Sequence, residues 1–186
     1  MTLRPGGGQV DWRADVLKFW FGLDYDHWFN SEPSLDDRIK LRFLKAWAEK
    51  RQLPPDTFLA DPLTALAGVI LFDQFPRNMF RGDAEQFATD PLALATARGA
   101  VDRGFDDHLT PDERAFLYLP FEHSENMADQ DRSVLLFTAL GDPRYLKYAK
   151  LHHHIIERFG RFPHRNAILG RASRPDERAA GDVVPW

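Results

Sequence analysis

Four times along this chain a residue that can cap a helix stands directly before a proline, and this repeated pair is the strongest constraint on the fold. A capping side-chain oxygen accepts a backbone N–H at the start of a helix, and a proline in the first turn removes no donor that the helix needs. Each pair therefore predicts a helix start. The pairs are Asp61-Pro62, Asp90-Pro91, Thr110-Pro111 and Asp142-Pro143, and Glu113 completes a predicted capping box after Thr110.

Between these starts the apolar residues recur at helical spacing. Leu35, Ile39, Phe43 and Trp47 lie four residues apart, which places them on one helix face. No stretch shows the alternation of a half-buried strand bounded by turns. The sequence predicts helices over residues 11–21, 35–50, 62–74, 91–103, 111–119, 129–140 and 143–159, with short pieces near 121–126, 164–169 and 175–180.

The length and composition fit one helical domain. The chain has 186 residues, of which 44% are hydrophobic, and chains usually divide into domains only beyond roughly 250–300 residues. Short connections between helices favour antiparallel neighbours, so we predict an all-α fold of stacked antiparallel helical hairpins. We expect a flexible N-terminus at residues 1–10, a single compact domain at 11–180 and a C-terminal tail at 181–186.

Composition also excludes several classes of function. The absence of cysteine excludes disulfides, a thiol nucleophile and a cysteine zinc site, and it permits a reducing, cytoplasmic location. The net charge of -4 argues against a nucleic-acid partner. The longest uncharged apolar run, residues 62–72, is much shorter than the about 20 residues that span a bilayer. We therefore expect a cytoplasmic protein that binds neither nucleic acid nor membrane.

Two related motifs follow two apolar helical segments. One reads Phe-Pro-Arg-Asn from Phe75 and continues to Arg81, and the other reads Phe-Pro-His-Arg-Asn from Phe162 and continues to Arg171. Each proline is expected to end the preceding helix and to hold the residue before it extended. The planar fork of arginine suits a carboxylate or a phosphate. Alternatively, the arginines and asparagines tie loop carbonyls and acidic side chains of neighbouring helices.

A third motif reads Pro-Phe-Glu-His-Ser-Glu from Pro120. The proline predicts a kink or a restart of the helix. Glu122 and Glu125 are three residues apart and share one helix face, whereas His123 points about 100° away. A histidine close to carboxylates suits a general base. The alternative is that both glutamates pair with arginines across a helix interface.

His152 lies on the apolar stripe of the helix predicted at 143–159. A histidine in such a stripe is either a hydrogen-bonded core residue or a functional group. It would complete a metal site with the carboxylates and imidazole of the third motif. The Glu-x-x-His pattern of di-metal helical proteins is absent, however.

The strings LFDQFPRNMFRG, LPFEHSE and IIERFGRFPHRNAILGR resemble family 924 of the domains of unknown function, over about residues 16–171. The resemblance implies an all-α fold similar to tetratricopeptide-repeat proteins, and it implies no established activity. The chain departs from the family near its C-terminus, where Ala179-Ala180-Gly181 replaces the apolar part of a final helix. That helix is therefore predicted to be short, which weakens any wall that it gives to a pocket.

The leading hypothesis is a site for a small anionic ligand, binding or hydrolytic, that the three motifs build together. The alternatives are a tetratricopeptide-like module that binds a protein or peptide, and a metal-dependent hydrolase that uses Glu122, His123, Glu125 and His152. No cofactor is identified and no metal ligand is assigned. The catalytic candidates are His123, Glu122 and His164, and the ligand-binding candidates are Asp73, Arg77, Asn78, Arg81, Glu125, His152, Arg161, Arg165, Asn166 and Arg171.

Overall fold

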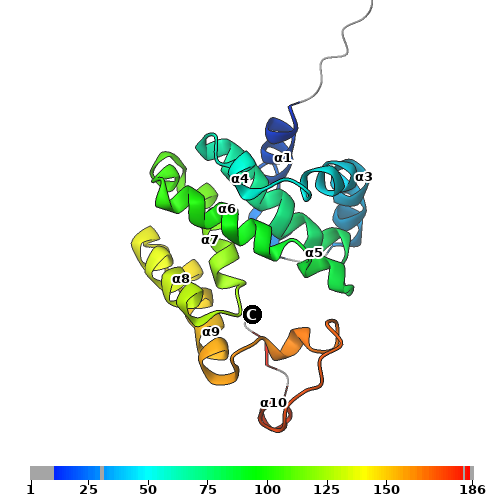
Figure 1. Ribbon diagram of the computed structural model, residues 1–186, viewed down its shortest axis with the longest axis vertical. Coiled ribbons are helices and arrows are strands. Elements are labelled where there is room, and N and C mark those ends of the chain that lie inside the picture. Colours follow the sequence, from blue (N-terminus) through cyan, green and yellow to red (C-terminus); the bar gives the residue numbers. More distant parts are fainter. Residues whose placement is uncertain (1–10, 30–31, 182, 185–186) are drawn as a thin grey trace, which may run out of the picture.

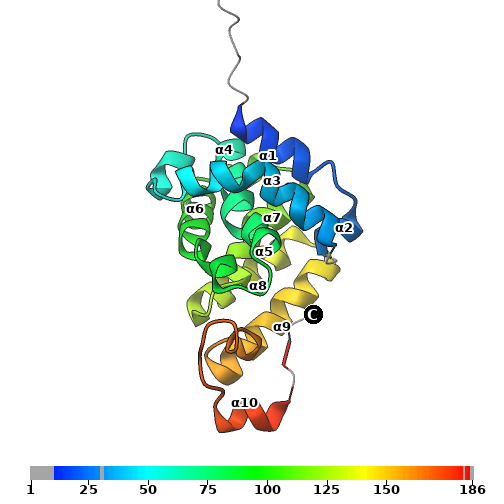
Figure 2. The same ribbon diagram turned by 90° about the vertical axis from the view of Figure 1, so that its right-hand side faces the viewer.

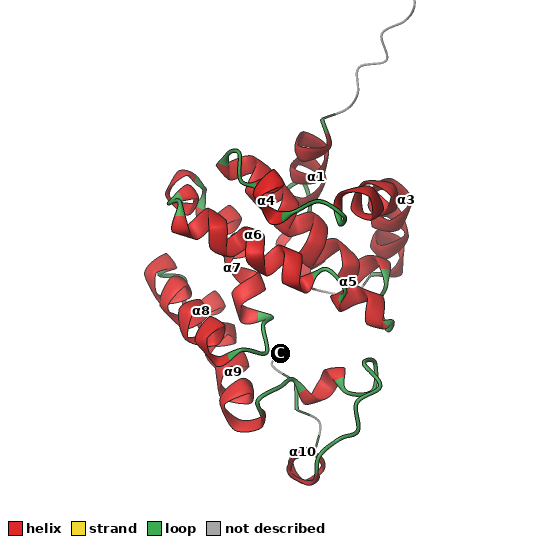
Figure 3. Cartoon of the chain, viewed as in Figure 1, coloured by secondary structure: helices red, strands yellow, loops and turns green. Residues whose placement is uncertain are grey.

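The computed structural model describes residues 11–29, 32–181 and 183–184, and most of these residues lie in helices and short helical turns (Figure 3). Within these residues there is no strand, which confirms the all-α prediction. No helix in the same ranges is long and apolar enough to cross a bilayer. The flexible N-terminus predicted at 1–10 lies outside the described residues, as do residues 182, 185 and 186 of the predicted tail.

The long helices fall where the sequence predicts them, whereas a helix after residue 24 and several short turns were not predicted (Figure 1). The α-helices are α1 (Trp12–Trp20), α2 (Tyr25–Phe29), α3 (Pro33–Lys50), α4 (Pro62–Val69), α5 (Phe75–Met79), α6 (Asp90–Asp102), α7 (Pro111–Glu122), α8 (Met127–Leu140), α9 (Pro143–Phe159) and α10 (Pro175–Ala180). The short turns are η1 (Pro55–Phe58), η2 (Ile70–Gln74), η3 (Ala84–Phe87), η4 (Phe105–His108) and η5 (Pro163–Arg165).

Three of the four predicted caps are present. The side chains of Asp61, Thr110 and Asp142 each accept a backbone N–H in the first turn of a helix, and the capping box of α7 is complete. The prediction is wrong at Asp90, which is the first residue of α6 and follows the cap residue Thr89. The carboxylate of Asp90 instead binds arginine side chains outside its own helix.

The prolines of two motifs do not interrupt their helices as predicted. Phe75, before Pro76, is helical at φ -61° and ψ -37°, because the π-helical turn η2 carries α4 directly into α5. The proline then falls in the first turn of α5, where its missing N–H costs little. Helix α7 likewise runs through Pro120 to its end. In the second arginine motif, Phe162 is extended as predicted.

The last three long helices are consecutive neighbours in space. Helix α8 packs against both α7 and α9, and Gly141, with φ +80°, forms the tight turn between α8 and α9. This stacking agrees with the predicted helical hairpins. Figure 2 shows α9 extending from the main body toward the segment that contains α10.

The main apolar core lies where α1, α3 and the α4–η2–α5 segment meet. Phe75 has no exposed surface, and its ring contacts those of Phe19, Trp20 and Phe43. The face predicted for α3 is correct, because all four of its apolar residues are buried. The core therefore fixes the positions of η2, which carries Asp73, and of α5, which carries the first motif.

A smaller apolar cluster supports the second motif. It consists of Ile155, Ile156 and Phe159 of α9 with Phe162, and Ala180 and Val183 pack against it. Helix α10 has only six residues, as the missing apolar residues predict. The C-terminal segment therefore covers this apolar cluster with the two small side chains Ala180 and Val183, where a longer helix would add more apolar residues.

We expect Phe75→Ala to lower the free energy of unfolding by about 3–5 kcal/mol, because it leaves a cavity in the core. Leu41→Ala is the matched control, since Leu41 is 90% exposed on α3, and it should change stability by less than about 0.5 kcal/mol. Urea unfolding of both variants measures the difference. Equal effects would contradict the assignment of this core.

Candidate functional site

A fully buried carboxylate, that of Asp73, lies at the centre of the candidate site. It lies on η2, where its Oδ1 is 2.8 Å from Nδ1 of His123 and 3.3 Å from Nη1 of Arg77. Its Oδ2 accepts a hydrogen bond of 2.6 Å from Gln74. Burial alone would raise the pKa of Asp73, but the charge of Arg77 and these hydrogen bonds outweigh burial and lower it to about 2. Asp73 is therefore ionised in the folded protein.

His123 follows the last residue of α7 and faces this carboxylate. Gln130 of α8 fixes the turn, because its side chain donates to the carbonyl oxygens of Glu122 and Ser124, at 2.7 Å each. An ionised Asp73 only accepts, so Nδ1 of His123 carries the proton and Nε2 keeps its lone pair. Burial and the charge of Arg77 lower the pKa of His123. The side chain is 15% exposed, so a neutral imidazole borders the solvent.

Both terminal nitrogens of Arg77, the arginine of the first motif, donate to protein oxygens. Arg77 donates to both oxygens of Asp90 in a bidentate pair, at 2.9 and 3.1 Å, and it also donates to the backbone carbonyl oxygen of Asp73. Such a fork is a strong charge-assisted arrangement. Arg77 therefore contributes positive charge to the site, while both of its terminal nitrogens already donate to protein oxygens.

The arginine of the second motif is buried but poorly paired. Arg165 is 7% exposed, and its guanidinium lies over the rings of Phe87 and Phe162 at 4.6 and 4.5 Å from their centroids. Its ion pair with Asp90 is 3.6 Å long, beyond hydrogen-bond distance. Among the described residues, its buried Nε has no hydrogen-bond partner. Burial and the neighbouring Arg77 lower the pKa of Arg165 to about 10, so it remains charged at neutral pH.

Glu122 and His152 form a second buried pair beside the first. Nδ1 of His152 lies 3.1 Å from Oε1 of Glu122 and 2.9 Å from the carbonyl oxygen of Tyr148. Burial and the negative charge of Asp73 raise the pKa of Glu122 to about 8. Burial and the neighbouring His123 lower the pKa of His152 to about 3. At neutral pH the pair is therefore an uncharged carboxylic acid beside an uncharged imidazole.

The two pairs lie against each other. The imidazole rings of His123 and His152 have centroids 6.2 Å apart, and the ring of Phe162 lies 5.5 Å from that of His152. We call these two pairs, together with Arg77, Asp90 and Arg165, the inner cluster. It combines an imidazole with an available lone pair, a protonated carboxyl group and a buried guanidinium. These are the groups required to hold an anion and to move a proton on it.

Four of the other candidates belong to a separate polar network under the C-terminal segment. Glu125 pairs with both terminal nitrogens of Arg171 at 2.7 and 3.0 Å. Glu177 of α10 accepts from Arg161 at 2.6 Å and from Asn166 at 2.9 Å. These side chains are paired with one another, so their geometry supports the structural alternative for them.

Of the remaining candidates, Asn78 and Arg81 lie outside the cluster, whereas the charge of His164 interacts with those of His123 and His152. Asn78 and Arg81 both donate to Asp36 of α3, at 2.8 Å. His164 stands beside the ring of Phe162, with centroids 5.6 Å apart. Burial and the charge of Arg165 lower the pKa of His164 to about 4. Asn78 and Arg81 therefore attach α5 to α3.

Sequence reasoning missed two residues of the cluster. The sequence pattern predicts that Asp90 caps a helix, but its carboxylate accepts hydrogen bonds from Arg77 and forms a 3.6 Å ion pair with Arg165. Phe87 of η3, whose ring lies against Arg165, belongs to no recognised motif. The Asp-Pro pair at residue 90 marked a helix start, but it gave no indication that the carboxylate is used elsewhere.

The described residues contain no group of three or more histidine, aspartate or glutamate side chains placed to hold a metal ion. Glu122 and Glu125, two members of the hypothetical metal site, have different partners: His152 and Arg171.

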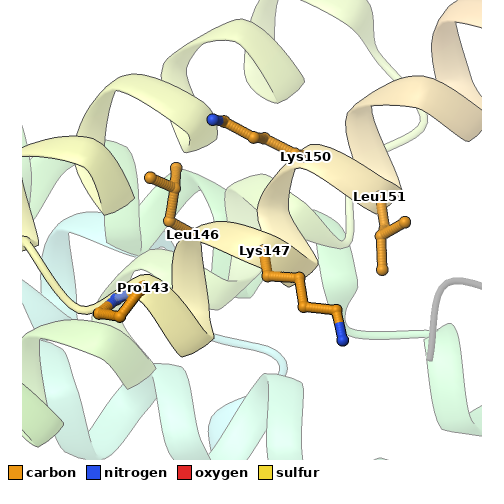
Figure 4. A pocket seen from close by; sticks show the side chains of 5 residues that line it. All are labelled: Pro143, Leu146, Lys147, Lys150 and Leu151. Carbon is orange, nitrogen blue, oxygen red and sulfur yellow. The ribbon is translucent and has the colours of Figure 1, made fainter.

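An open groove lies elsewhere, along α9, and Figure 4 shows its lining side chains. They are Pro143, Leu146, Lys147, Lys150 and Leu151.

Comparison with known proteins identifies relatives of unknown function. The model of the family described as "Bacterial protein of unknown function (DUF924)" matches residues 16–180. A solved structure of a protein of unknown function from Agrobacterium tumefaciens is 44% identical, with a TM-score of 0.83, over 90% of this chain and 95% of that chain. No curated protein matches the chain.

The pKa of Glu122 predicts a characteristic pH dependence of stability. Between its ordinary value of 4.5 and about 8, the folded protein holds a proton that the unfolded chain has released. Stability from this group is therefore present below pH 4.5, falls as the pH rises and levels off above pH 8. Relative to Glu122→Gln, the wild type should lose roughly 2–5 kcal/mol of unfolding free energy across this range.

Urea unfolding of both proteins at pH 5, 6, 7 and 8 measures that difference. The variant removes the titration but keeps the size of the side chain, so it also cancels the contributions of the other titrating groups. A difference that stays constant with pH would show that Glu122 is ionised in the folded protein at neutral pH.

Proposed function

The chain belongs to the bacterial family of unknown function DUF924, and we propose that it binds a small anionic ligand at Arg165, where Arg77 adds positive charge, and moves a proton on that ligand through His123. The proposal concerns the inner cluster only, formed by Asp73, Arg77, Asp90, Glu122, His123, His152 and Arg165. We also propose a cytoplasmic location, because a chain without cysteine suits a reducing compartment.

The incomplete pairing of Arg165 carries this proposal. A buried donor without a partner costs roughly 1–3 kcal/mol, and more when it is charged. The half-buried arginines of the C-terminal network, Arg161 and Arg171, instead pair with glutamates. An anion that accepts from Nε of Arg165 would remove the cost in the inner cluster.

The Asp73–His123 pair supports the proton-transfer step. An ionised carboxylate that accepts from Nδ1 holds the imidazole ring and leaves the lone pair of Nε2 for a proton. Glu122 stands beside it as an acid that is protonated at neutral pH. Groups whose environments push their pKa values in opposite directions suit opposite roles, so His123 acts as the base and Glu122 as the acid.

The groove on α9 favours a second candidate, an interaction module that binds an acidic peptide. Two lysines flank an apolar strip there (Figure 4), and Leu151 is partly exposed. If the protein is a peptide-binding module, the arginines of the inner cluster have only a structural role. No small anion should then stabilise the protein through them.

A thermal-shift measurement with Arg165→Gln tests the proposed site. Formate, acetate, sulfate and inorganic phosphate are added to the wild type at pH 7. An anion at about ten times its Kd should add roughly 1.4 kcal/mol of stability and raise the Tm by about 3–6 °C. We expect Arg165→Gln to fold and to lose this increase, because it lacks the charged fork.

Arg81→Gln is the matched control, since Arg81 pairs with Asp36 of α3 and with no member of the cluster. It should retain the full increase in Tm. If no anion stabilises the wild type, or if Arg165→Gln responds as strongly as Arg81→Gln, the proposed site is wrong.

The tautomer of His123 gives an independent prediction. At pH 7 the ring should be neutral with its proton on Nδ1, because Asp73 accepts from that nitrogen. Long-range 15N–1H NMR spectra of the imidazole distinguish the two tautomers. Asp73→Asn should reduce the population of the Nδ1–H form, whereas a ring that carries its proton on Nε2 in the wild type would contradict the assigned role.

A further inference from the structure

The charges of the inner cluster restrict the kind of anion that fits. Two guanidinium groups, of Arg77 and Arg165, face two carboxylates, of Asp73 and Asp90. Glu122 has no arginine or lysine partner among the described residues and is uncharged at neutral pH. The charges of the cluster therefore cancel before a ligand binds.

A doubly charged ligand is unfavourable in such a balanced site. A phosphate monoester carries about -1.5 to -2 charges at pH 7, and it would lie beside two buried aspartates. Like charges at close range in a poorly solvated site repel strongly. A singly charged anion adds the least uncompensated charge.

The shape of the available donors also favours a flat group. The terminal nitrogen Nη1 of Arg165 faces Asp90, and the Nε side of the same guanidinium has no partner among the described residues. Phe87 and Phe162 lie against the guanidinium. Two coplanar oxygens match the edge that Nε and a terminal nitrogen of a guanidinium form.

We infer that the ligand of this site is a carboxylic acid with one negative charge, bound through its two oxygens to the Nε side of Arg165. This inference rests on the proposed function and specifies its ligand class. Glu122 and His123 border the same cluster, so the reacting part of the molecule lies next to its carboxylate. Phosphate esters and other dianions are excluded by charge, and sulfonates by shape.

Three probes of similar size separate charge from shape. Acetate is planar and singly charged, methanesulfonate is tetrahedral and singly charged, and methyl phosphate is tetrahedral and mostly doubly charged. Their Kd values are determined at pH 7 by thermal-shift titration of the wild type and of Arg165→Gln. We expect acetate to bind at least about tenfold more tightly than either other probe, and only to the wild type.

The results separate a failure of the carboxylate assignment from a failure of the anion site. Methyl phosphate or methanesulfonate that binds as tightly as acetate, and that needs Arg165, would overturn the carboxylate assignment while the anion site stands. If all three probes fail to bind, or bind equally well to Arg165→Gln, the anion site itself is wrong.

In Asp90→Asn, which removes one negative charge, the preference against methyl phosphate should shrink by about tenfold. An unchanged preference would overturn the charge argument.

Discussion

The burial of an ionised carboxylate at Asp73 is the constraint on which the rest of the site depends. A carboxylate without solvent is tolerated only when donors surround it, and here Gln74, Arg77 and His123 supply them. These donors come from η2, α5 and the end of α7, so the network joins the apolar core to the polar cluster. Asp73 lies on a π-helical turn, and such turns are frequent at functional sites.

The two related motifs use their arginines in different ways. Arg77 and Arg165 reach the same carboxylate, Asp90, but Arg77 has a bidentate pair and Arg165 has a long ion pair. The asparagines and the later arginines of both motifs bind carboxylates elsewhere. The structural interpretation therefore applies to the asparagines and to the arginines that form hydrogen-bonded pairs with carboxylates. The functional interpretation applies to Arg165, which forms no such pair within the described part of the chain.

Much of the fold could be predicted from local sequence because caps and helical spacing are local properties. The face of α3 and the capping box of α7 are examples. The π-helical turn and the passage of α7 through Pro120 were not predictable in this way. Proline alone disfavours a helical residue before it and a helix that continues past it. Whether a helix tolerates these departures depends on its packing against other helices, which is not a local property of the sequence.

The composition of the site was only partly predictable for a similar reason. Arg165 and Arg171 are the same residue type in one motif, yet, over the residues that the structure describes, only Arg171 forms hydrogen bonds with a glutamate, Glu125. Which arginine pairs with a carboxylate depends on the packing of segments that are distant in the sequence, and local sequence does not predict that packing. Asp90 illustrates the same limit, because its cap pattern is identical to those of Asp61 and Asp142.

The side-chain Nε–H resonance of Arg165 offers the most direct test of the account. In 1H–15N spectra of the wild type titrated with acetate at pH 7, this resonance should shift progressively and saturate, because Nε gains the acceptor that it lacks. The Nε–H resonance of Arg171, which already donates to Asn166 at 3.0 Å, should stay in place. An Arg165 resonance that does not respond to acetate or to any other small anion would contradict the account, and the cluster would then be a structural network.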